Sequence, residues 1–418
     1  MAVLEQAHPV RPVGAGFVTA FTLAQIGAYI GFVPLFQILL PLKAAVIDPV
    51  HKTILLSHVM FYGALAAGAA NLVAGAISDR TGSRHGRRRP WLLAGAGGTL
   101  VAYALIFRAN NGVGLLGAVL FFQLAFNFLF AALLAVMADR VPDRQKGLVS
   151  GLMALGLPLG TVGGAALVGG LLRDDAARFT ALAVAVALTI VPFALRLSDD
   201  PLSASAKAAF RPLDFLKGFW VDPRAHPDFA LAWVGRFLVI IAFSVIQGYM
   251  LYYLQDKVDY PRLFPGRRAE EGLAILTAIY AAANIAFAVI GGLLSDRLGR
   301  RKLFVMFGAA LIACAIAILA LTSSWPAVMT AYALYGCGAG CYYAVDMALI
   351  TQVLPTAQDV GKDLGIVNLS NTLPQSVAPL LGMWFLGSGH ADFRSLFLVA
   401  AAMSVLGGLM VLPIRKVR

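Results

Sequence analysis

The sequence predicts an all-α protein that lies in a membrane, because its composition is incompatible with a water-soluble surface. Apolar residues make up 60% of the 418 residues and charged residues 13%, and the mean hydropathy is +0.80. A soluble domain carries roughly 25% charged residues. The composition therefore excludes a soluble enzyme, a nucleic-acid-binding protein and a disordered scaffold, although the net charge of +12 taken alone would be compatible with nucleic acid.

Twelve apolar stretches are long enough to cross a bilayer, which requires about 20 residues in a helix. They cover roughly residues 14–40, 54–78, 91–107, 112–138, 147–172, 177–196, 228–254, 271–294, 303–322, 326–354, 363–388 and 393–414. A backbone in lipid must satisfy its own hydrogen bonds, and these stretches are too long for the strands of a barrel. The sequence therefore predicts twelve transmembrane helices.

One long polar connection separates the first six stretches from the last six. It predicts an N-terminal six-helix bundle over residues 1–196, a cytoplasmic linker over 197–227 and a C-terminal six-helix bundle over 228–418. With the N-terminus inside, the inner loops hold more than twice as many Lys and Arg residues as the outer loops. This bias predicts that both termini are cytoplasmic. The preference for Arg over Lys and the short loops favour a bacterial inner membrane.

An internal repeat relates the two sets of helices. Gly75-Ala-Ile-Ser-Asp-Arg-Thr-Gly82 returns 217 residues later as Gly292-Leu-Leu-Ser-Asp-Arg-Leu-Gly299. The pattern Asp143-x-x-Lys-x-Leu, followed by Leu157-Pro158, returns as Asp359-x-x-Lys-x-Leu, followed by Leu373-Pro374. Two matches at nearly the same offset predict pseudo-symmetric six-helix bundles in parallel orientation, an arrangement known among secondary transporters.

These loop motifs resemble the signature of the major facilitator superfamily, and the resemblance covers the whole chain. The longer N-terminal copy, Ser78-Asp-Arg-Thr-Gly-Ser-Arg-His-Gly-Arg-Arg-Arg-Pro90, resembles the sucrose/proton symporter branch and its glycoside–cation symporter relatives. Lys362-Asp-Leu-Gly-Ile-Val-Asn-Leu369 with Pro374-Gln375 is similar to a helix-eleven signature of that branch. The resemblance implies the major facilitator fold and transport by alternating access.

One position departs from the resemblance. The plant sucrose carriers have an acidic proton site in the middle of helix four, counted back from an Ala-Asp pair that here is Ala138-Asp139. The corresponding residue is Gln123, which cannot titrate. Either the proton binds elsewhere or the protein is a uniporter.

Arg236 and Asp346 are the two charged residues that lie well inside predicted spans. A charge in the hydrocarbon costs about 3 kcal/mol on insertion scales and marks a candidate functional site. Both lie roughly 12–14 Å from the cytoplasmic ends of their helices, at 1.5 Å per residue, so they can pair. The hypothesis is that Asp346 accepts a proton or cation and that Arg236 tunes the pKa of Asp346. A static ion pair, or an Arg236 that snorkels to the headgroups, is the alternative.

Neutral polar side chains recur at helical spacing inside the spans and predict a site for a polyhydroxylated substrate. Amides bind hydroxyl groups, and aromatic rings cover the C–H faces of a sugar. The predicted substrate-binding residues are Gln25, Tyr29, Gln123, Asn127, Gln247, Asn284, Tyr342, Asn368, Asn371 and Gln375. Because the spans contain many neutral polar residues and almost no charged ones, the pattern favours a neutral substrate. Hydrogen bonds between helices are the alternative explanation for each of them.

Loop motifs and helix breakers predict the gating elements. The predicted gating residues are Asp79, Arg80, Asp296, Arg297, Pro158 and Pro374. Family resemblance implies that the carboxylates latch the cytoplasmic side, and each proline is expected to break its helix as a hinge. Helix five carries glycines for close helix approach and sliding: Gly147, Gly151, Gly156, Gly160 and Gly164. Ordinary packing is the alternative explanation for these glycines and for the two prolines. Arg84, Arg87, Arg88 and Arg89 are expected to set the topology and to contact anionic lipids, with substrate binding as the alternative.

The functional prediction is proton-coupled uptake of a neutral sugar or glycoside, with a sucrose-like disaccharide as one possibility. A sugar uniporter and an exporter of a small apolar compound are the alternatives. No enzyme, cofactor, metal site or nucleic acid is predicted, and the three cysteines show no metal-ligand pattern. The expected partners are the substrate, the proton and the lipid bilayer, and the protein is expected to act as a monomer.

Overall fold

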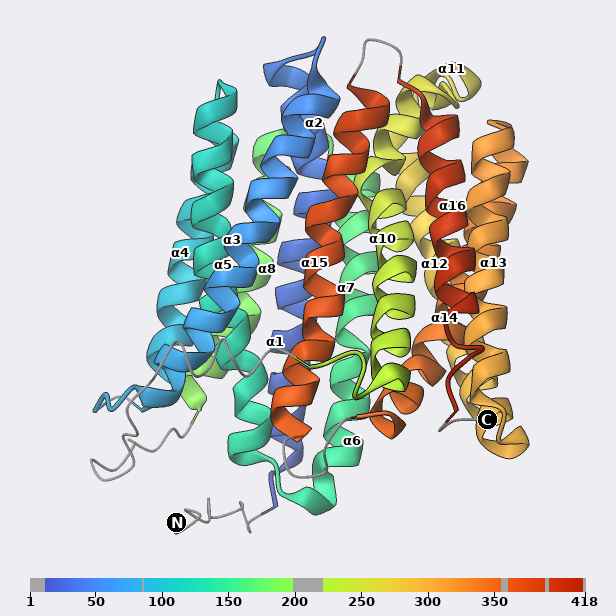
Figure 1. Cartoon of the computed structure of the whole chain (residues 1–418). Helices are drawn as coiled ribbons and strands as arrows, with labels where there is room; N and C mark the ends of the chain where they lie inside the picture. The colour runs from blue at the N-terminus through green and yellow to red at the C-terminus, as the bar shows by residue number, and fades with distance from the viewer. Residues whose placement is uncertain (1–11, 85, 198–220, 355–359, 388–390, 416–418) are drawn as a thin grey trace. The chain divides into compact units, whose positions relative to one another are not determined.

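The computed structural model describes residues 12–84, 86–197, 221–354, 360–387 and 391–415. It does not describe the side chains of residues 72, 76, 79, 80 and 360–365. The described residues are helical apart from turns, short connections and one isolated bridge between Ser83 and Gly86 (Figure 1). The predicted all-α membrane fold is confirmed.

Each of the twelve predicted stretches contains a helix. The elements are α1 (Ala15–Pro34), η1 (Leu35–Leu39), α2 (Leu40–Ile47), α3 (Lys52–Arg80), α4 (Arg89–Arg108), α5 (Gly112–Arg140), α6 (Asp143–Ala154), α7 (Gly156–Gly164), η2 (Ala165–Leu171), α8 (Asp175–Arg196), α10 (Pro227–Asp256), α11 (Tyr260–Leu263), α12 (Ala269–Leu298), α13 (Arg301–Leu321), α14 (Trp325–Gln352), α15 (Val360–Leu386) and α16 (Phe393–Leu409). Ten helical stretches of the described residues are long and apolar enough to cross a membrane. The segments η1 and η2 are π-helical.

The chain divides into two compact units whose bounds cut through two helices. One unit comprises Met1–Phe36 and Ala66–Phe210, and the other comprises Gln37–Leu65 and Arg211–Arg418. The division falls at η1 in the first predicted span and within α3 in the second. The segment Gln37–Leu65 thus packs with residues of the C-terminal half.

In the first unit, glycines of α7 allow close contact with α1. A Cβ atom on Gly156 would lie 2.8 Å from Gln25 Cγ, and one on Gly160 would lie 2.5 Å from Tyr29 Cβ. A Cβ on Gly164 would overlap Pro34. Three of the five predicted glycines therefore serve close packing, whereas Gly147 and Gly151 have open space where a Cβ would be.

Replacing Gly160 by Ala is expected to destabilise the protein, because the new methyl group would also lie 3.1 Å from the Ile26 carbonyl oxygen and the Ile30 backbone nitrogen. Backbone atoms cannot move aside as a flexible side chain can, and overpacking typically costs about 1–3 kcal/mol. Thermal unfolding in detergent measures the loss. The matched control is Gly151→Ala, which is expected to leave stability unchanged or slightly raised. Equal melting temperatures for the two variants would contradict the packing described.

In the second unit, glycines of α14 play the same role on two faces. Cβ atoms on Gly336 and Gly340 would come too close to the backbone oxygens of Tyr280 and Asn284 on α12, and one on Gly338 would lie 2.7 Å from the Gly308 oxygen on α13. Each of these glycines removes a Cβ where another backbone approaches. The α14 backbone, which carries Asp346, is therefore tightly held between α12 and α13.

The two predicted hinge prolines differ in their effect. Helix five is interrupted at Leu155, between α6 and α7 and three residues before Pro158, as expected from the clash of a proline ring with the preceding turn. The helix α15, in contrast, continues through both Pro374 and Pro379. The predicted break at Pro374 is wrong: a proline removes one backbone donor, and packing of α15 against α10 supports the helix across that gap.

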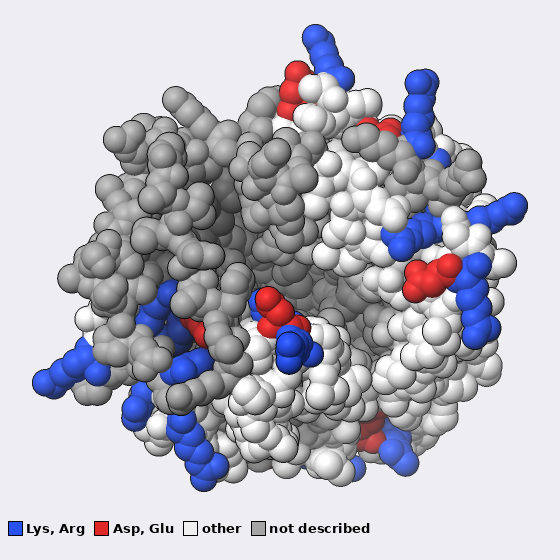
Figure 2. Space-filling model, turned by 90° about the horizontal axis from the view of Figure 1, so that it is seen from below, with Lys and Arg blue, Asp and Glu red and all other residues white. Residues whose placement is uncertain are grey.

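Large apolar side chains are exposed along most helices, as expected for a surface that contacts lipid. Trp384 is 80% exposed and Leu188 69% exposed, and both lie in predicted spans. Charged side chains instead project from the face seen from below in Figure 2, where more of the described ones are basic than acidic.

Candidate functional site

Arg236 and Asp346, the two charged residues predicted to lie deep inside spans, form an ion pair in the second unit. Arg236 on α10 pairs through Nη1 with Oδ2 of Asp346 on α14. Both residues are only 4% exposed. The structure thus brings together the two residues that the depth argument from the sequence had matched, and it excludes the alternative in which Arg236 snorkels to the headgroups.

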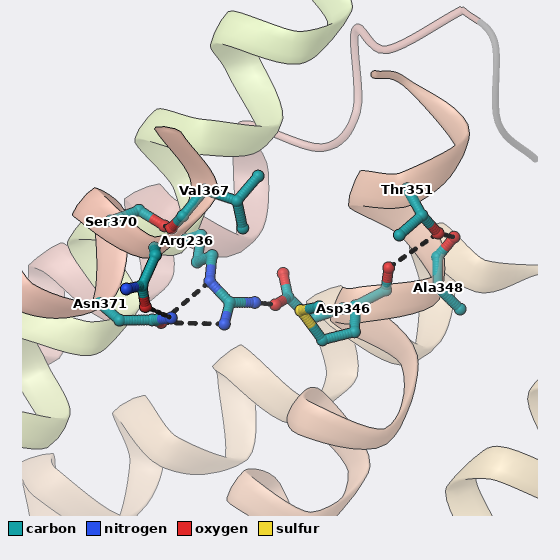
Figure 3. Close-up of polar contacts among 9 residues, drawn as sticks. Arg236, Asp346, Ala348, Thr351, Val367, Ser370 and Asn371 are labelled. Carbon is teal, nitrogen blue, oxygen red and sulfur yellow. Dashed lines mark hydrogen bonds and ion pairs between the residues drawn. The ribbon is translucent and has the colours of Figure 1, made fainter. Parts of the chain in front are cut away.

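The same arginine also binds an amide on a third helix, as Figure 3 shows. Arg236 donates to Oδ1 of Asn371 on α15 through Nε at 3.2 Å and through Nη2 at 2.9 Å. The Nε–Nη2 edge of the guanidinium group therefore donates to Asn371, while Nη1 pairs with the carboxylate. A planar fork of donors suits such a bridging position, which Lys could not fill in the same way.

The polar residues of α15 lie on one helical face, as predicted. Asn371 Nδ2 approaches Asn368 Oδ1 at 3.5 Å, and Gln375 Nε2 donates to the Asn371 backbone oxygen at 3.2 Å. Asn368 and Gln375 are exposed in the unit, and Asn371 is half-buried. This face thus combines open amides with an amide that is held by a charge.

The first unit contains a second set of linked amides. Asn127 on α5 donates through Nδ2 to the backbone oxygen of Gln123 at 2.8 Å and to its Oε1 at 3.3 Å. It accepts in turn from Asn71 on α3 at 3.3 Å. Gln123 is 3% exposed. The residue that stands where the sucrose carriers have an acid is therefore part of a neutral hydrogen-bonded cluster.

The remaining predicted substrate residues are distributed between the units. In the first unit Gln25 is buried on α1, and Tyr29 packs edge-on against Phe130 at 5.5 Å. In the second unit Asn284 is half-buried on α12 and Tyr342 is buried on α14, one turn from Asp346. Tyr342 makes an edge-on ring contact with Tyr343 at 5.7 Å.

Gln247 has a partner that the sequence did not predict. It accepts from Gln37 of η1 at 2.9 Å. Further along the same segment Ser57 shares a hydrogen bond of 2.5 Å with Tyr249, and Lys52 binds Asp256 at 2.6 Å. These contacts attach the segment Gln37–Leu65 to α10 within the second unit. The Gln247 amide is therefore engaged by the protein itself in this structure.

The predicted gating residues are only partly described. Asp79 and Arg80 end α3, and their side chains lie outside the described residues. Asp296 lies 3.7 Å from Arg301 Nη2 with 75% of its side chain exposed, and Arg297 is exposed. A pair in which the carboxylate is exposed to this extent contributes little stability, so it can form and break at little cost.

The expected lipid contact of Arg88 is wrong. Its side chain is 4% exposed and donates to Asp139 Oδ2 at 2.7 Å and to Ser78 Oγ at 2.7 Å. Arg87 also approaches Asp139, at 3.5 Å. Because Asp139 ends α5 and Ser78 lies near the end of α3, Arg88 ties three helices of the first unit together. Charge counting could not reveal this, because it does not place helix ends beside one another.

Three residues of these clusters were missed in the sequence. Gln37 is the one polar residue between Tyr29 and Lys43, and Asn71 is isolated in an Ala- and Gly-rich run; a polar residue in such a run is itself a signal. Ser57 does not stand out in this way, because other polar residues lie close to it in the sequence. Its partner Tyr249 could be identified only from the packed helices.

The apolar helices, with a buried ion pair and neutral amides among them, are those of a multi-pass membrane protein. The family model of the Major Facilitator Superfamily matches residues 15–266 and 268–418, and the chain belongs to this superfamily. The predicted superfamily membership is confirmed, whereas the sucrose and glycoside branch stays a prediction.

Several curated proteins are similar to parts of the chain. An uncharacterized MFS-type transporter of Schizosaccharomyces pombe is 28% identical over 39% of the chain and 36% of its own length. The multidrug resistance protein MdtL of Shewanella oneidensis is 31% identical over 33% of the chain and 34% of its own length. The cis,cis-muconate transport protein of Acinetobacter baylyi is 23% identical over 71% of both. The chain spans about a third of the length of the first curated relatives that it matches.

Solved structures share the fold. The nucleoside transporter NupG has a TM-score of 0.72 at 12% identity, over 96% of this chain and 99% of its own. A bacterial homolog of the human lysosomal transporter Spinster, inward-facing and unoccupied, has a TM-score of 0.68 at 15% identity, over 96% of this chain and 98% of its own. At these identities the likeness concerns the fold alone.

Proposed function

We propose that the protein is a secondary active transporter that couples uptake of a neutral sugar or glycoside to a proton. The observation that carries this proposal is the ion pair between Arg236 and Asp346, because it is buried and shares its arginine with the amide-bearing helix α15. A buried carboxylate that is held by one arginine can change that contact when it gains a proton. The proton site and the substrate amides are then adjacent.

A neutral polyhydroxylated substrate fits the composition of both polar clusters. Asn127 and Gln123 offer amides in the first unit, and Asn368 and Gln375 offer exposed amides in the second. Amides donate to and accept from hydroxyl groups, which suits sugars better than carboxylates or phosphates. A sucrose-like disaccharide is the first candidate.

The proposed mechanism is alternating access between the two predicted bundles, 1–196 and 228–418, linked by 197–227. Asp346 accepts the proton, and Arg236 tunes how readily that carboxylate binds it. The cytoplasmic side is gated by Asp79, Arg80, Asp296 and Arg297. Pro158, at the break in helix five, acts as a hinge. We expect a monomer in the bacterial inner membrane with both termini in the cytoplasm.

Uptake of radiolabelled sucrose into proteoliposomes tests this function. With an inward proton gradient we expect accumulation, and with a protonophore present we expect equilibration only. The control is empty liposomes under the same gradient. Uptake that reaches the same level with and without the gradient would contradict coupling, and absence of uptake of sucrose and of a glycoside panel would contradict the substrate class.

A second candidate is a uniporter for a sugar or an exporter of a small apolar compound. Two observations favour it: Gln123 stands where the resembled carriers have an acid, and some relatives are named multidrug resistance proteins. Efflux of a lipophilic dye from loaded vesicles, with no response to sugars, would support the exporter over the symporter.

A further inference from the structure

Arg236 is in contact with two groups of different kinds at once. Its Nη1 pairs with the carboxylate of Asp346, and its Nε and Nη2 both donate to Oδ1 of Asn371, at 3.2 and 2.9 Å (Figure 3). The arginine side chain is 5% exposed, so water cannot readily replace either partner. Whatever moves the guanidinium group therefore changes its contact with both.

The amide oxygen of Asn371 is saturated in this arrangement. An amide oxygen has two lone pairs, and Arg236 occupies both through its two donors. Asn371 therefore cannot accept from a substrate hydroxyl while Arg236 holds it. Its neighbours Asn368 and Gln375, on the same exposed face of α15, have no such bond from a charged group among the described residues.

Within the described residues, the carboxylate recorded on Arg236 is that of Asp346 alone. Asp228 on α10 accepts from the Arg415 backbone nitrogen, and Arg301 on α13 donates to the Ala348 oxygen. Two other titratable groups, Tyr342 and Tyr343 on α14, interact electrostatically with Arg236. Of the other helices packed on α10, α12 carries Asp296 and Arg297 at its end and α16 carries Arg394 at its start. The helix α15 carries no charged residue from Ile366 to Leu386. The charge state of Asp346 is therefore the variable that Arg236 experiences most directly.

We propose that Asn371 is the substrate-binding residue that links protonation of Asp346 to substrate binding. When Asp346 takes up a proton, Arg236 loses its charged partner and shifts its donors. The amide oxygen of Asn371 then becomes free to accept from a hydroxyl group of the substrate. Substrate and proton consequently favour each other's binding, since coupling between two sites is reciprocal. The inference rests on the proposed sugar/proton symport and adds the residue through which the two ligands are coupled.

The chain contains a reporter close to this site. Trp233, one turn from Arg236 on α10, donates through Nε1 to the Ile366 oxygen on α15 at 2.7 Å. Replacing the other four tryptophans, Trp91, Trp220, Trp325 and Trp384, by Phe gives a protein whose emission comes from Trp233 alone. Its emission between pH 5 and 9 in nanodiscs follows the contact between α10 and α15 without any substrate.

The experiment compares this reporter protein with its Asn371→Ala, Asn371→Asp and Asp346→Asn variants. The reporter protein is expected to show a sigmoidal pH response and to bind sucrose about tenfold more tightly at pH 5.5 than at pH 8, within the usual range of coupling. Asn371→Ala is expected to reduce that ratio to about one and to change the Trp233 titration. Asn371→Asp, which is isosteric, is expected to keep Arg236 held at both pH values and so also abolish the ratio. Asp346→Asn is expected to remove the pH response.

The matched control is Thr372→Ala, next to Asn371; among the described residues its hydroxyl donates to the Asn368 backbone oxygen at 3.4 Å. This variant is expected to keep both the response and the ratio. If both Asn371 variants keep the pH ratio of the reporter protein, the proposal is overturned while symport stands. If no sucrose binds, the sugar assignment fails. The Trp233 titration then tests the role of Asn371 by itself: a pH curve that is unchanged in both Asn371 variants overturns the proposal.

Discussion

Replacing Asp346 by Asn is expected to abolish accumulation of the sugar against its gradient while downhill exchange continues. A gradient of one pH unit corresponds to about 1.4 kcal/mol, so coupling to one proton supports about tenfold accumulation. Asn has the shape of Asp, and its oxygen can still accept from Arg236, but it cannot carry the proton. The accumulation ratio in proteoliposomes should therefore fall from about ten to about one.

The control for this variant is sucrose counterflow, which needs binding and alternating access but no net proton movement. Counterflow by Asp346→Asn at a rate near that of the parent protein shows that the site is intact. A matched carboxylate outside the site, Asp296, is exposed at the end of α12, and Asp296→Asn is expected to slow uptake without changing the accumulation ratio. Full accumulation by Asp346→Asn would remove Asp346 from the coupling mechanism.

Replacing Arg236 by Ala is expected to cause the largest loss of stability. The variant leaves the Asp346 carboxylate buried at 4% exposure without its charged partner, and it also leaves the Asn371 oxygen without its donors. Breaking a buried pair by removing one partner typically costs about 3–5 kcal/mol. Thermal unfolding of the purified protein in detergent is expected to show a strongly lowered melting temperature.

Two further variants make that result specific. Arg262 is an arginine whose side chain is 87% exposed and lies 3.9 Å from Asp259, so Arg262→Ala is expected to change stability by less than about 0.5 kcal/mol. The double variant Arg236→Gln with Asp346→Asn replaces the ions by neutral amides and is expected to recover most of the stability. A single Arg236→Ala variant as stable as the parent would show that the ion pair contributes nothing to the fold.

The ion pair could be predicted because it depends on two properties that a sequence contains. Arg236 and Asp346 are rare charges in long apolar runs, and their distances from the helix ends give matching depths. The contact between Arg236 and Asn371 could not be predicted in this way, because it depends on how α10 and α15 are rotated against each other. That rotation is set by side-chain packing along both helices.

Arg88 and Pro374 depart from expectation for the same physical reason. Arg88 was expected at the lipid surface, because its loop is basic; it is buried because α3 and α5 end beside it and supply Ser78 and Asp139. Pro374 was expected to break its helix as Pro158 does, but a proline in a well-packed helix costs only one backbone bond locally. In both cases tertiary packing overrides a local rule. The close packing of Gly160 on α1, by contrast, follows a spacing rule that is itself about packing.

Movement of a proton together with a neutral sugar can be measured directly. Sucrose is added to proteoliposomes in a weakly buffered medium with no imposed gradient, and the external pH is followed with an electrode. The medium is expected to become more alkaline in proportion to the sugar taken up, and Asp346→Asn is expected to give no pH change. Uptake of sucrose by the parent protein without any change of external pH would contradict this coupling.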